Sequence, residues 1–201
     1  NQPRLPKGYS RRLDSGNMSW IDANLCAIVD AECLIKIAKQ IGRENEVDGL
    51  KEEVKYLVSF VIKNMWDKKT DFFYDLNADG TFGKCKTIGA FWAMHIDAIP
   101  EKYVKKLVKH LMDPKEFNRY NPVPSISADS PMYDPNGKYW RGGVWSCTDY
   151  MVFSGLIKHG YYKEAYELAE RHNRLISTIY KDTGTLWEVY APDSLEKSEP
   201  S

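Results

Sequence analysis

The spacing of six predicted helices constrains the fold of this chain most. Their expected ranges are 20–41, 46–66, 88–98, 100–112, 144–159 and 162–180. They fall into three pairs, because the turns at 43–45, 99 and 160–161 are short and the connections between pairs are long. The first helix of each pair is the more apolar and the second the more amphipathic, which predicts an inner and an outer ring of helices. All long connections then emerge at one end, where we expect a site.

Helix-boundary residues support this layout. Ser19 is an expected N-cap, and Gly42 and Gly160 are expected helix ends. Between the first two pairs, residues 72–76 and the return from Thr81 predict a small β-hairpin around a turn at 77–80.

An internal repeat points to the same architecture. Leu-Ile-Lys at 34–36 recurs at 156–158, and TDFFYD at 70–75 parallels TGTLWE at 183–188. The repeat places Asp75 and Glu188 at equivalent positions of successive units. The chain is therefore expected to be all-α, with about three of the six helix pairs of an (α/α)6 toroid. Residues 1–201 would be part of such a domain, and the other half of the ring would cover the inner helices.

Charge and cysteine content exclude several classes of protein. Lys plus Arg and Asp plus Glu both number 28, which gives no field to attract nucleic acid or an anionic membrane. No apolar run approaches the ~20 residues of a membrane-spanning helix. The four cysteines lack CxxC spacing, so we expect free thiols, no zinc site and a reducing, cytoplasmic compartment, unless an export signal precedes Asn1. The 13% aromatic content suits carbohydrate or peptide binding.

The first candidate site segment is TGTLWEVYAPD, residues 183–193. Glu188 lies there between Trp187 and Tyr190. Aromatic faces can stack on a sugar ring and exclude water, and a carboxylate beside them can serve as acid or base. The alternative is that the two aromatic residues cap a core and Glu188 points to water.

The second candidate segment is YWRGGVW, residues 139–145. We expect four of its residues to bind substrate: Trp140, Arg141, Gly142 and Trp145. The tryptophans offer an aromatic platform, the arginine a planar donor, and the glycine pair N–H groups free at a helix start. In the alternative, the tryptophans fill a core and the arginine pairs with Asp134 or Asp149.

Weaker candidates stand at the starts of two inner helices. Asp22 and Asn24 begin the first helix, where helix capping explains Asp22 equally well. Lys86 and Thr87 precede the third. The four histidines (His95, His110, His159, His172) accompany no nucleophile elbow, and the chain has no phosphate loop or dinucleotide fingerprint.

Taken together, the stretches at 124–145 and 183–193 resemble the C-terminal catalytic region of glycoside hydrolase family 63. KTIGAFW and WIDANL fall where that family has similar segments. The family includes processing α-glucosidase and bacterial relatives and is related to trehalases. The resemblance implies an (α/α)6 barrel that hydrolyses oligosaccharides or small glycosides with inversion, with no metal or other cofactor.

The resemblance also implies roles for particular residues. Glu188 takes the place of the general base. Residues 1–4, Asn-Gln-Pro-Arg, are similar to the end of the family motif whose aspartate is the general acid. That aspartate would then lie just before Asn1. The isolated chain would lack it and be inactive. Two departures put the substrate preference in doubt: residues 146–149 replace an Asn-containing segment, and Val189 replaces an asparagine.

These observations predict a glycosidase acting on α-glucosidic or α-mannosidic bonds. Two alternatives stay open. A sugar epimerase of the same toroid class would need paired histidines at the site, and a non-catalytic carbohydrate-binding fragment would need no catalytic carboxylate.

Overall fold

A computed structural model describes residue 4 and residues 17–83 and 85–198. The main helices are α1 (Ile21–Gln40), α2 (Asp48–Phe60), α3 (Glu101–Leu111), α4 (Ser146–Lys158) and α5 (Tyr162–Thr183). Shorter elements are the 3-10 helices η1 (Glu44–Glu46), η3 (Ile88–His95) and η4 (Tyr139–Arg141), and the π-helical turn η2 (Val61–Met65), which prolongs α2. Six helical segments thus lie within a few residues of their predicted ranges.

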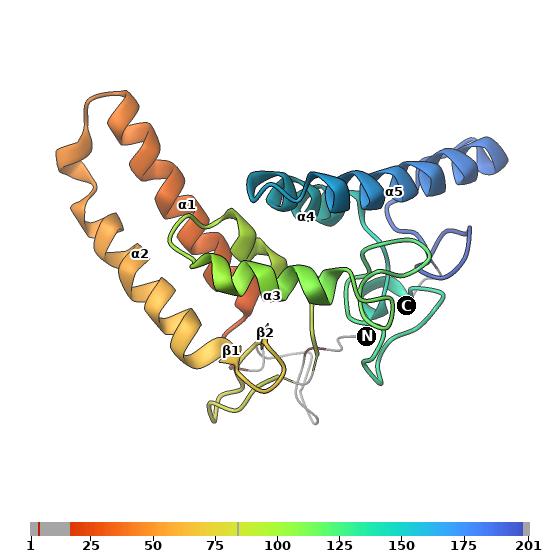
Figure 1. Cartoon of the computed structure of the whole chain (residues 1–201), viewed down its shortest axis with the longest axis horizontal. Helices are drawn as coiled ribbons and strands as arrows, with labels where there is room; N and C mark the ends of the chain where they lie inside the picture. Colours follow the sequence, from red (N-terminus) through yellow and green to blue (C-terminus); the bar gives the residue numbers. More distant parts are fainter. Residues whose placement is uncertain (1–3, 5–16, 84, 199–201) are drawn as a thin grey trace.

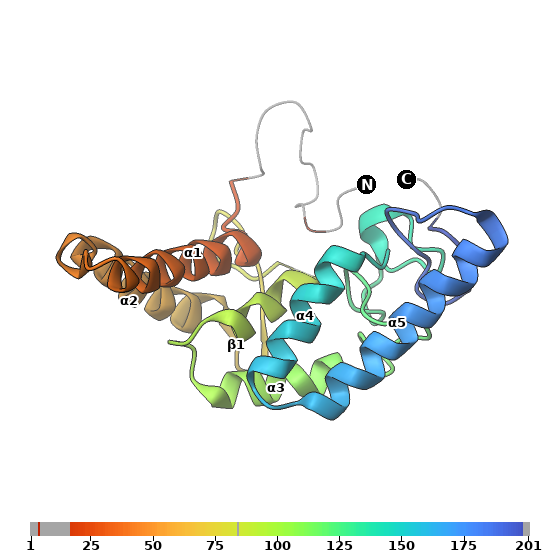
Figure 2. The same ribbon diagram turned by 90° about the horizontal axis from the view of Figure 1, so that it is seen from above.

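The helices pair as the sequence predicts. α1 packs against α2, η3 against α3, and α4 against α5. The first members of the pairs also touch one another, α1 with η3 and η3 with α4. Figures 1 and 2 show the α1/α2 and α4/α5 pairs as two arms with η3 and α3 between them. α1, η3 and α4 therefore form a consecutive inner layer.

The second inner segment differs from its prediction. A helix over 88–98 was expected, but η3 is a 3-10 helix that ends at His95. The chain then turns to α1, because Glu32 accepts hydrogen bonds from the N–H groups of Asp97 (3.0 Å) and Ala98 (3.2 Å). Those N–H groups are then not available to continue the helix.

The predicted hairpin is present with a different pairing. The turn forms, since Asn77 N donates to Thr81 O over 2.9 Å and Leu76 bridges to Phe82. The two-stranded ladder, however, joins β1 (Trp66–Asp67) to β2 (Phe72–Phe73), antiparallel, with Trp66 opposite Phe73. The Trp66 and Phe73 rings meet edge to face 4.6 Å apart. This aromatic contact lies where β2 pairs with β1, which precedes it in the chain, and not with the residues after the turn.

Two hydrophobic cores hold the described residues together. The main core joins the inner layer to α3, and at its centre Phe72 contacts the rings of Phe91 and Phe117. A smaller core forms around Val144, Leu175, Ile179 and Tyr190, and connects α5 to both candidate site segments.

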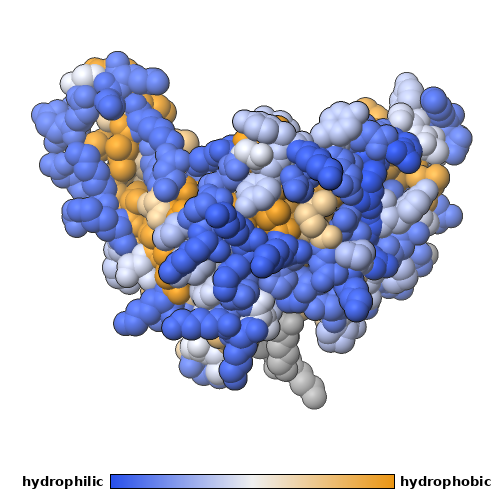
Figure 3. Space-filling model, viewed as in Figure 1, coloured by the Kyte–Doolittle hydropathy of each residue, from blue (hydrophilic) through white to orange (hydrophobic). Residues whose placement is uncertain are grey.

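Parts of the inner layer are uncovered. Leu34 and Ile37 of α1 are each 50% exposed. Apolar surface is visible along the α1/α2 arm (Figure 3). No helix in the described part of the chain is long and apolar enough to cross a membrane. The four cysteine residues form no disulfide bond within the described residues.

The main core predicts a strong effect of one ring. Phe72 is fully buried, so Phe72→Ala is expected to lower the free energy of unfolding by about 3–5 kcal/mol, from lost burial and the cavity left behind. Tyr166→Ala, at a 75% exposed position, should stay within about 0.5 kcal/mol of the parent. Urea unfolding of both variants measures this, and equal midpoints would contradict the core assignment.

Candidate active site

The two candidate segments are joined by main-chain hydrogen bonds. Val144 N donates to Tyr190 O over 2.9 Å, and Tyr190 N donates to Val144 O over 3.0 Å. Both side chains are buried against Leu175 and Ile179, which belong to the apolar stripe of α5. The structure therefore brings YWRGGVW and LWEVY together, although they are more than forty positions apart in the sequence.

Close approach of these segments requires a glycine. A Cβ on Gly143 would lie 2.5 Å from Val189 Cγ2 and well inside contact distance of Tyr139 O. The side chain of Val189, the residue after Glu188, thus packs directly on Gly143.

The expectation that the glycine N–H groups are free for a ligand is wrong. Gly142 N donates to Ser125 Oγ (3.1 Å), and Gly143 N donates to Tyr139 O (2.9 Å). Ser125 also donates its own N–H to Gly143 O and accepts at its carbonyl from Ile88 N, both over 3.0 Å. Sequence reasoning missed this serine, which connects the glycine pair to the start of η3. Only its position in the long connection between the second and third helix pairs, at the end where a site was expected, pointed to it.

Of the two tryptophans in YWRGGVW, one is buried in the core and the other lines a pocket. Trp140 and Trp145 stack with centroids 4.5 Å apart and an interplanar angle of 15°. Trp145 is 5% exposed and belongs to the interior, whereas Trp140 is half-buried. Tyr139 packs edge-on against Trp145 at 4.8 Å. The stack supports the ring of Trp140, which lines a pocket.

That pocket has a volume of about 180 Å³. Its walls come from the starts of all three inner segments and from the loop before α4. The lining residues are Arg4, Trp20, Asp22, Thr87, Ile88, Gly89, Trp92, Ser125, Ile126, Trp140 and Thr148. The pocket thus lies at the end of the inner layer where the long connections emerge, as the helix pairing predicts.

Asp22 lines the pocket, but Arg4 occupies its carboxylate. Arg4 Nη1 and Nη2 donate to the two oxygens of Asp22 over 2.7 and 2.9 Å. Burial acts to raise the pKa of Asp22, but the hydrogen bonds and charge of Arg4 outweigh it and lower the pKa. Arg4 also lies 4.3 Å over the Trp20 ring. Asn24 is turned to its own helix, donating to Trp20 O over 2.7 Å. Asn1 to Pro3, compared above with the acid-bearing motif, lie outside the described residues.

Asp75 and Glu188, placed at equivalent positions by the repeat, have opposite surroundings. Asp75 is 2% exposed and accepts hydrogen bonds from Arg4 (2.7 and 2.8 Å) and from Ile21 N (2.8 Å). Glu188 is exposed, and its carboxylate makes no hydrogen bond or ion pair with the described residues. Asp75 therefore holds a helix start in place, and Glu188 remains free to meet water or a ligand.

The aromatic residues beside Glu188 are anchored. Tyr190 is 1% exposed, and its hydroxyl accepts a hydrogen bond from Trp187 N over 3.1 Å. Trp187 is half-buried and donates a hydrogen bond from Nε1 to Thr183 Oγ1 over 3.2 Å. Lys197 Nζ lies over its ring, 4.4 Å from the ring centre. Glu188 thus projects from a segment with fixed neighbours.

Arg141 has neither of the partners considered for it. Its Nε donates to Met132 O over 2.9 Å. Asp134 lies 3.5 Å from Lys138 Nζ, and Asp149 Oδ2 lies 2.9 Å from His172 Nδ1. Complete burial raises the pKa of Asp149 to about 6, with His172 acting in the opposite direction.

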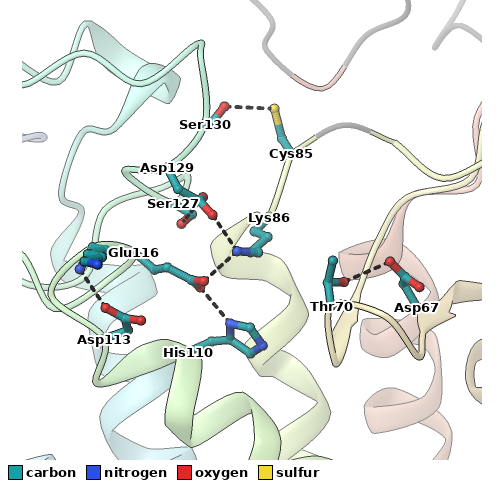
Figure 4. Close-up of polar contacts among 11 residues, drawn as sticks. Asp67, Thr70, Cys85, Lys86, His110, Asp113, Glu116, Ser127, Asp129 and Ser130 are labelled. Atoms are coloured by element: carbon teal, nitrogen blue, oxygen red, sulfur yellow. Dashed lines mark hydrogen bonds and ion pairs between the residues drawn. The ribbon is translucent and has the colours of Figure 1, made fainter.

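Lys86 is committed to a salt-bridge cluster (Figure 4). Its Nζ lies 2.6 Å from both Glu116 Oε1 and Asp129 Oδ2. The second oxygen of Glu116 contacts His110 Nδ1 at 2.7 Å. Lys86 therefore fixes the entry to η3. Thr87 is 3% exposed and contributes to the pocket wall.

The described residues contain no group of three or more His, Cys, Asp or Glu side chains arranged to hold a metal ion.

Comparison with known proteins identifies relatives of the chain. A family model for the "Mannosylglycerate hydrolase MGH1-like glycoside hydrolase domain" matches residues 6–198. An uncharacterized protein of Borreliella burgdorferi is 27% identical over 196 residues, which cover 96% of this chain and 39% of that protein. The mannosylglycerate hydrolase of Thermus thermophilus is 28% identical over 102 residues, covering 50% of this chain and 24% of that enzyme.

Solved structures share the fold. The family 63 mannosylglycerate hydrolase of Thermus thermophilus gives a TM-score of 0.78 at 19% identity and covers 92% of this chain and 42% of that one. The neutral trehalase Nth1 of Saccharomyces cerevisiae gives 0.74 at 18% identity, covering 90% and 35%. The cellobiose 2-epimerase of Spirochaeta thermophila gives 0.64 at 15% identity, covering 94% and 49%. The predicted toroid class and the resemblance to family 63 are confirmed. The chain spans about two fifths of the length of the Borreliella protein and the Thermus structure.

The packing of Gly143 predicts a local effect of one methyl group. Gly143→Ala is expected to destabilise the chain by about 1–3 kcal/mol, because Val189 and the Tyr139 carbonyl must move. Gly49→Ala, in α2 with nothing within 4 Å of the new Cβ, should leave stability unchanged or raise it by up to about 1 kcal/mol. Thermal unfolding of both variants checks this, and equal effects would refute the close approach.

Proposed function

Because the chain belongs to the mannosylglycerate hydrolase MGH1-like family of glycoside hydrolases, we propose that its protein hydrolyses the α-glycosidic bond of a small glycoside with inversion. Mannosylglycerate is the first substrate to test, because relatives carry its name. An α-glucoside is the second. Since the chain spans about two fifths of these relatives, the proposal concerns the activity of the complete protein.

The observation that carries the proposal is the main-chain pairing of Val144 with Tyr190. It joins the segment that carries Glu188 to the segment that supplies Trp140, a wall of the pocket, although Glu188 itself is not among the residues that line the pocket. A base-assisted hydrolysis requires a sugar held against such a wall with a water-accessible carboxylate beside it, and Glu188 is the proposed carboxylate in the complete protein.

In the proposed mechanism, Glu188 takes a proton from a water molecule as that water attacks the anomeric carbon. A carboxylic acid on the opposite face protonates the departing oxygen. In inverting enzymes the two carboxyl groups stand about 6.5–9.5 Å apart, which leaves room for the water. Glu188 suits the base role because its oxygens have no competing partner among the described residues.

The acid is proposed to come from outside the described residues. Asp22 lines the pocket, but its lowered pKa and its two hydrogen bonds from Arg4 favour the ionised form. An acid must carry a proton at the working pH, so Asp22 is unsuited to that step. The aspartate that the family resemblance places before Asn1 is the proposed donor.

The pocket suits a single sugar residue. Its volume of about 180 Å³ is below the roughly 300–1,000 Å³ of pockets that enclose a whole drug-sized ligand. Trp140 is proposed to face the sugar ring, with Trp20 and Trp92 as further aromatic walls. Trp145 and Tyr190 are proposed to support this surface from the interior, because they are 5% and 1% exposed.

Two other functions are less well supported. A sugar epimerase using paired histidines is disfavoured, because each of the four histidines contacts a carboxylate or a main-chain carbonyl. A carbohydrate-binding fragment without catalysis predicts that Glu188 is dispensable, which the experiment below decides.

We also propose that residues 1–201 form about half of the toroid. The exposed Leu34 and Ile37 of α1 would then pack against helices of the remaining part of the protein. Apolar residues at 50% exposure on an inner helix are otherwise a liability for solubility.

The base assignment is tested by Glu188→Gln in the protein at its full natural length. Loss of a general base is expected to lower kcat roughly 10²–10⁴-fold, while the pocket still binds substrate. Mannose release measures the rate, and proton NMR of the first-formed anomer reports inversion. Glu196→Gln, an exposed glutamate nearby in the sequence, is the matched control and should keep full activity. Undiminished hydrolysis by Glu188→Gln would overturn the assignment.

A further inference from the structure

Asp193, five residues after Glu188, receives three hydrogen bonds from the long loop before α4. Arg119 donates from Nε to Oδ1 over 3.0 Å and from Nη2 to Oδ2 over 3.1 Å. Tyr133 donates its hydroxyl to Oδ2 over 2.8 Å. The side chains of Asp193 and Arg119 are only 20% and 30% exposed. A forked arginine pair of this kind fixes orientation as well as distance.

The Arg119 guanidinium stays charged, and the Tyr133 hydroxyl stays protonated. The hydrogen bond from Arg119 to Asp193 raises the arginine pKa further. Burial, followed by the hydrogen bond to Asp193, raises the pKa of Tyr133, so its hydroxyl remains a donor at neutral pH. The Arg119 guanidinium also lies 5.8 Å from the centre of the Tyr133 ring, so each of the three side chains contacts the other two.

Asn121, from the same loop, holds the main chain on both sides of Asp193. Its Nδ2 donates to Ala191 O (2.7 Å) and Ser194 O (2.5 Å), and its N–H donates to Pro192 O (2.8 Å). Asn121 is 2% exposed. Residues 191–194 are therefore attached to the loop through both main-chain and side-chain contacts.

The chain is also held at two points closer to Glu188. Trp187, on its N-terminal side, donates a hydrogen bond to Thr183 of α5. Tyr190, between Glu188 and Asp193, exchanges main-chain hydrogen bonds with Val144. The Glu188 carboxylate itself has no bond to the described residues. Its location is then set by the main chain on either side and not by its own contacts.

We propose that Asp193 is a positioning residue for Glu188, and that Arg119 and Tyr133 act through it. Their contacts hold the segment that carries the base at a fixed distance from the pocket wall. The inference rests on the proposed base role of Glu188. A displacement of about 1 Å at a reacting group can cost roughly 10²-fold in rate, so a small relaxation of this segment has a large effect on catalysis.

The test uses Asp193→Asn and Tyr133→Phe in the protein at its full natural length. Asp193→Asn keeps the shape but weakens the arginine pair, and Tyr133→Phe removes one hydrogen bond with little change in volume. Both are expected to lower kcat, by roughly 10–100-fold for Asp193→Asn and less for Tyr133→Phe, with KM changed less than about twofold. Glu170→Gln is the matched control, because Glu170 accepts two hydrogen bonds from Arg174 (2.6 and 2.7 Å) at an exposed position. It should keep the parent kcat.

Amide hydrogen exchange supplies a readout independent of turnover. In Asp193→Asn the Tyr190 amide is expected to exchange faster, while amides in the middle of α1 keep their rates. An unchanged kcat in folded variants, a rise in KM alone, or unchanged exchange at Tyr190 would each overturn the positioning role. Activity retained by Glu188→Gln would instead overturn the proposed base, whatever Asp193→Asn shows.

Discussion

The pair of main-chain hydrogen bonds between Val144 and Tyr190 is the contact on which the candidate site depends. It joins the residues just before α4, an inner helix, to the segment that follows α5, the last outer helix. Two conditions make it possible: Gly143 leaves room for Val189, and the apolar stripe of α5 buries both paired side chains. Without either one, the carboxylate of Glu188 and the aromatic wall at Trp140 would have no fixed relation.

The same end of the inner layer collects polar contacts that order the loops. Lys86 pairs with two carboxylates before η3, Ser125 bonds to the glycine pair and to Ile88, and Arg4 bridges Asp22 and Asp75. The buried groups among them, such as Lys86, Glu116 and Asp75, would carry a desolvation cost of several kcal/mol if left unpaired. The pairing therefore favours one loop arrangement over the alternatives. A rigid wall around a small pocket follows from it.

Periodicity and turn residues were enough to predict the six helical segments and their pairing, because each outer helix carries a long apolar stripe and each pair has a short turn. They failed where a distant side chain decided the local structure. Glu32, more than sixty positions away, takes the N–H groups that a longer helix after His95 would use. Motif reasoning singled out Trp140, which lines the pocket, and Glu188, whose role as a base stays a prediction. It missed the contacts that Ser125, Asn121 and Asp193 make across the loop. It also misjudged the alternative ion-pair partners of Arg141 and the glycine N–H groups, since a short motif does not show its partners.

The contrast between Asp75 and Glu188 bears on how a repeated unit gives rise to a site. Both carboxylates follow an outer helix at equivalent places in the sequence. Asp75 accepts hydrogen bonds from Arg4 and from the start of α1, whereas Glu188 has no partner among the described residues. A buried carboxylate with three hydrogen bonds lends stability but is shielded from water and from a ligand. In the unit where the carboxylate stays free, Asp193, Asn121 and Val144 hold the chain around it. The contacts that hold this segment in place are made by the neighbours of Glu188 and not by its own side chain. The carboxylate therefore has a defined location and stays accessible to water or a ligand.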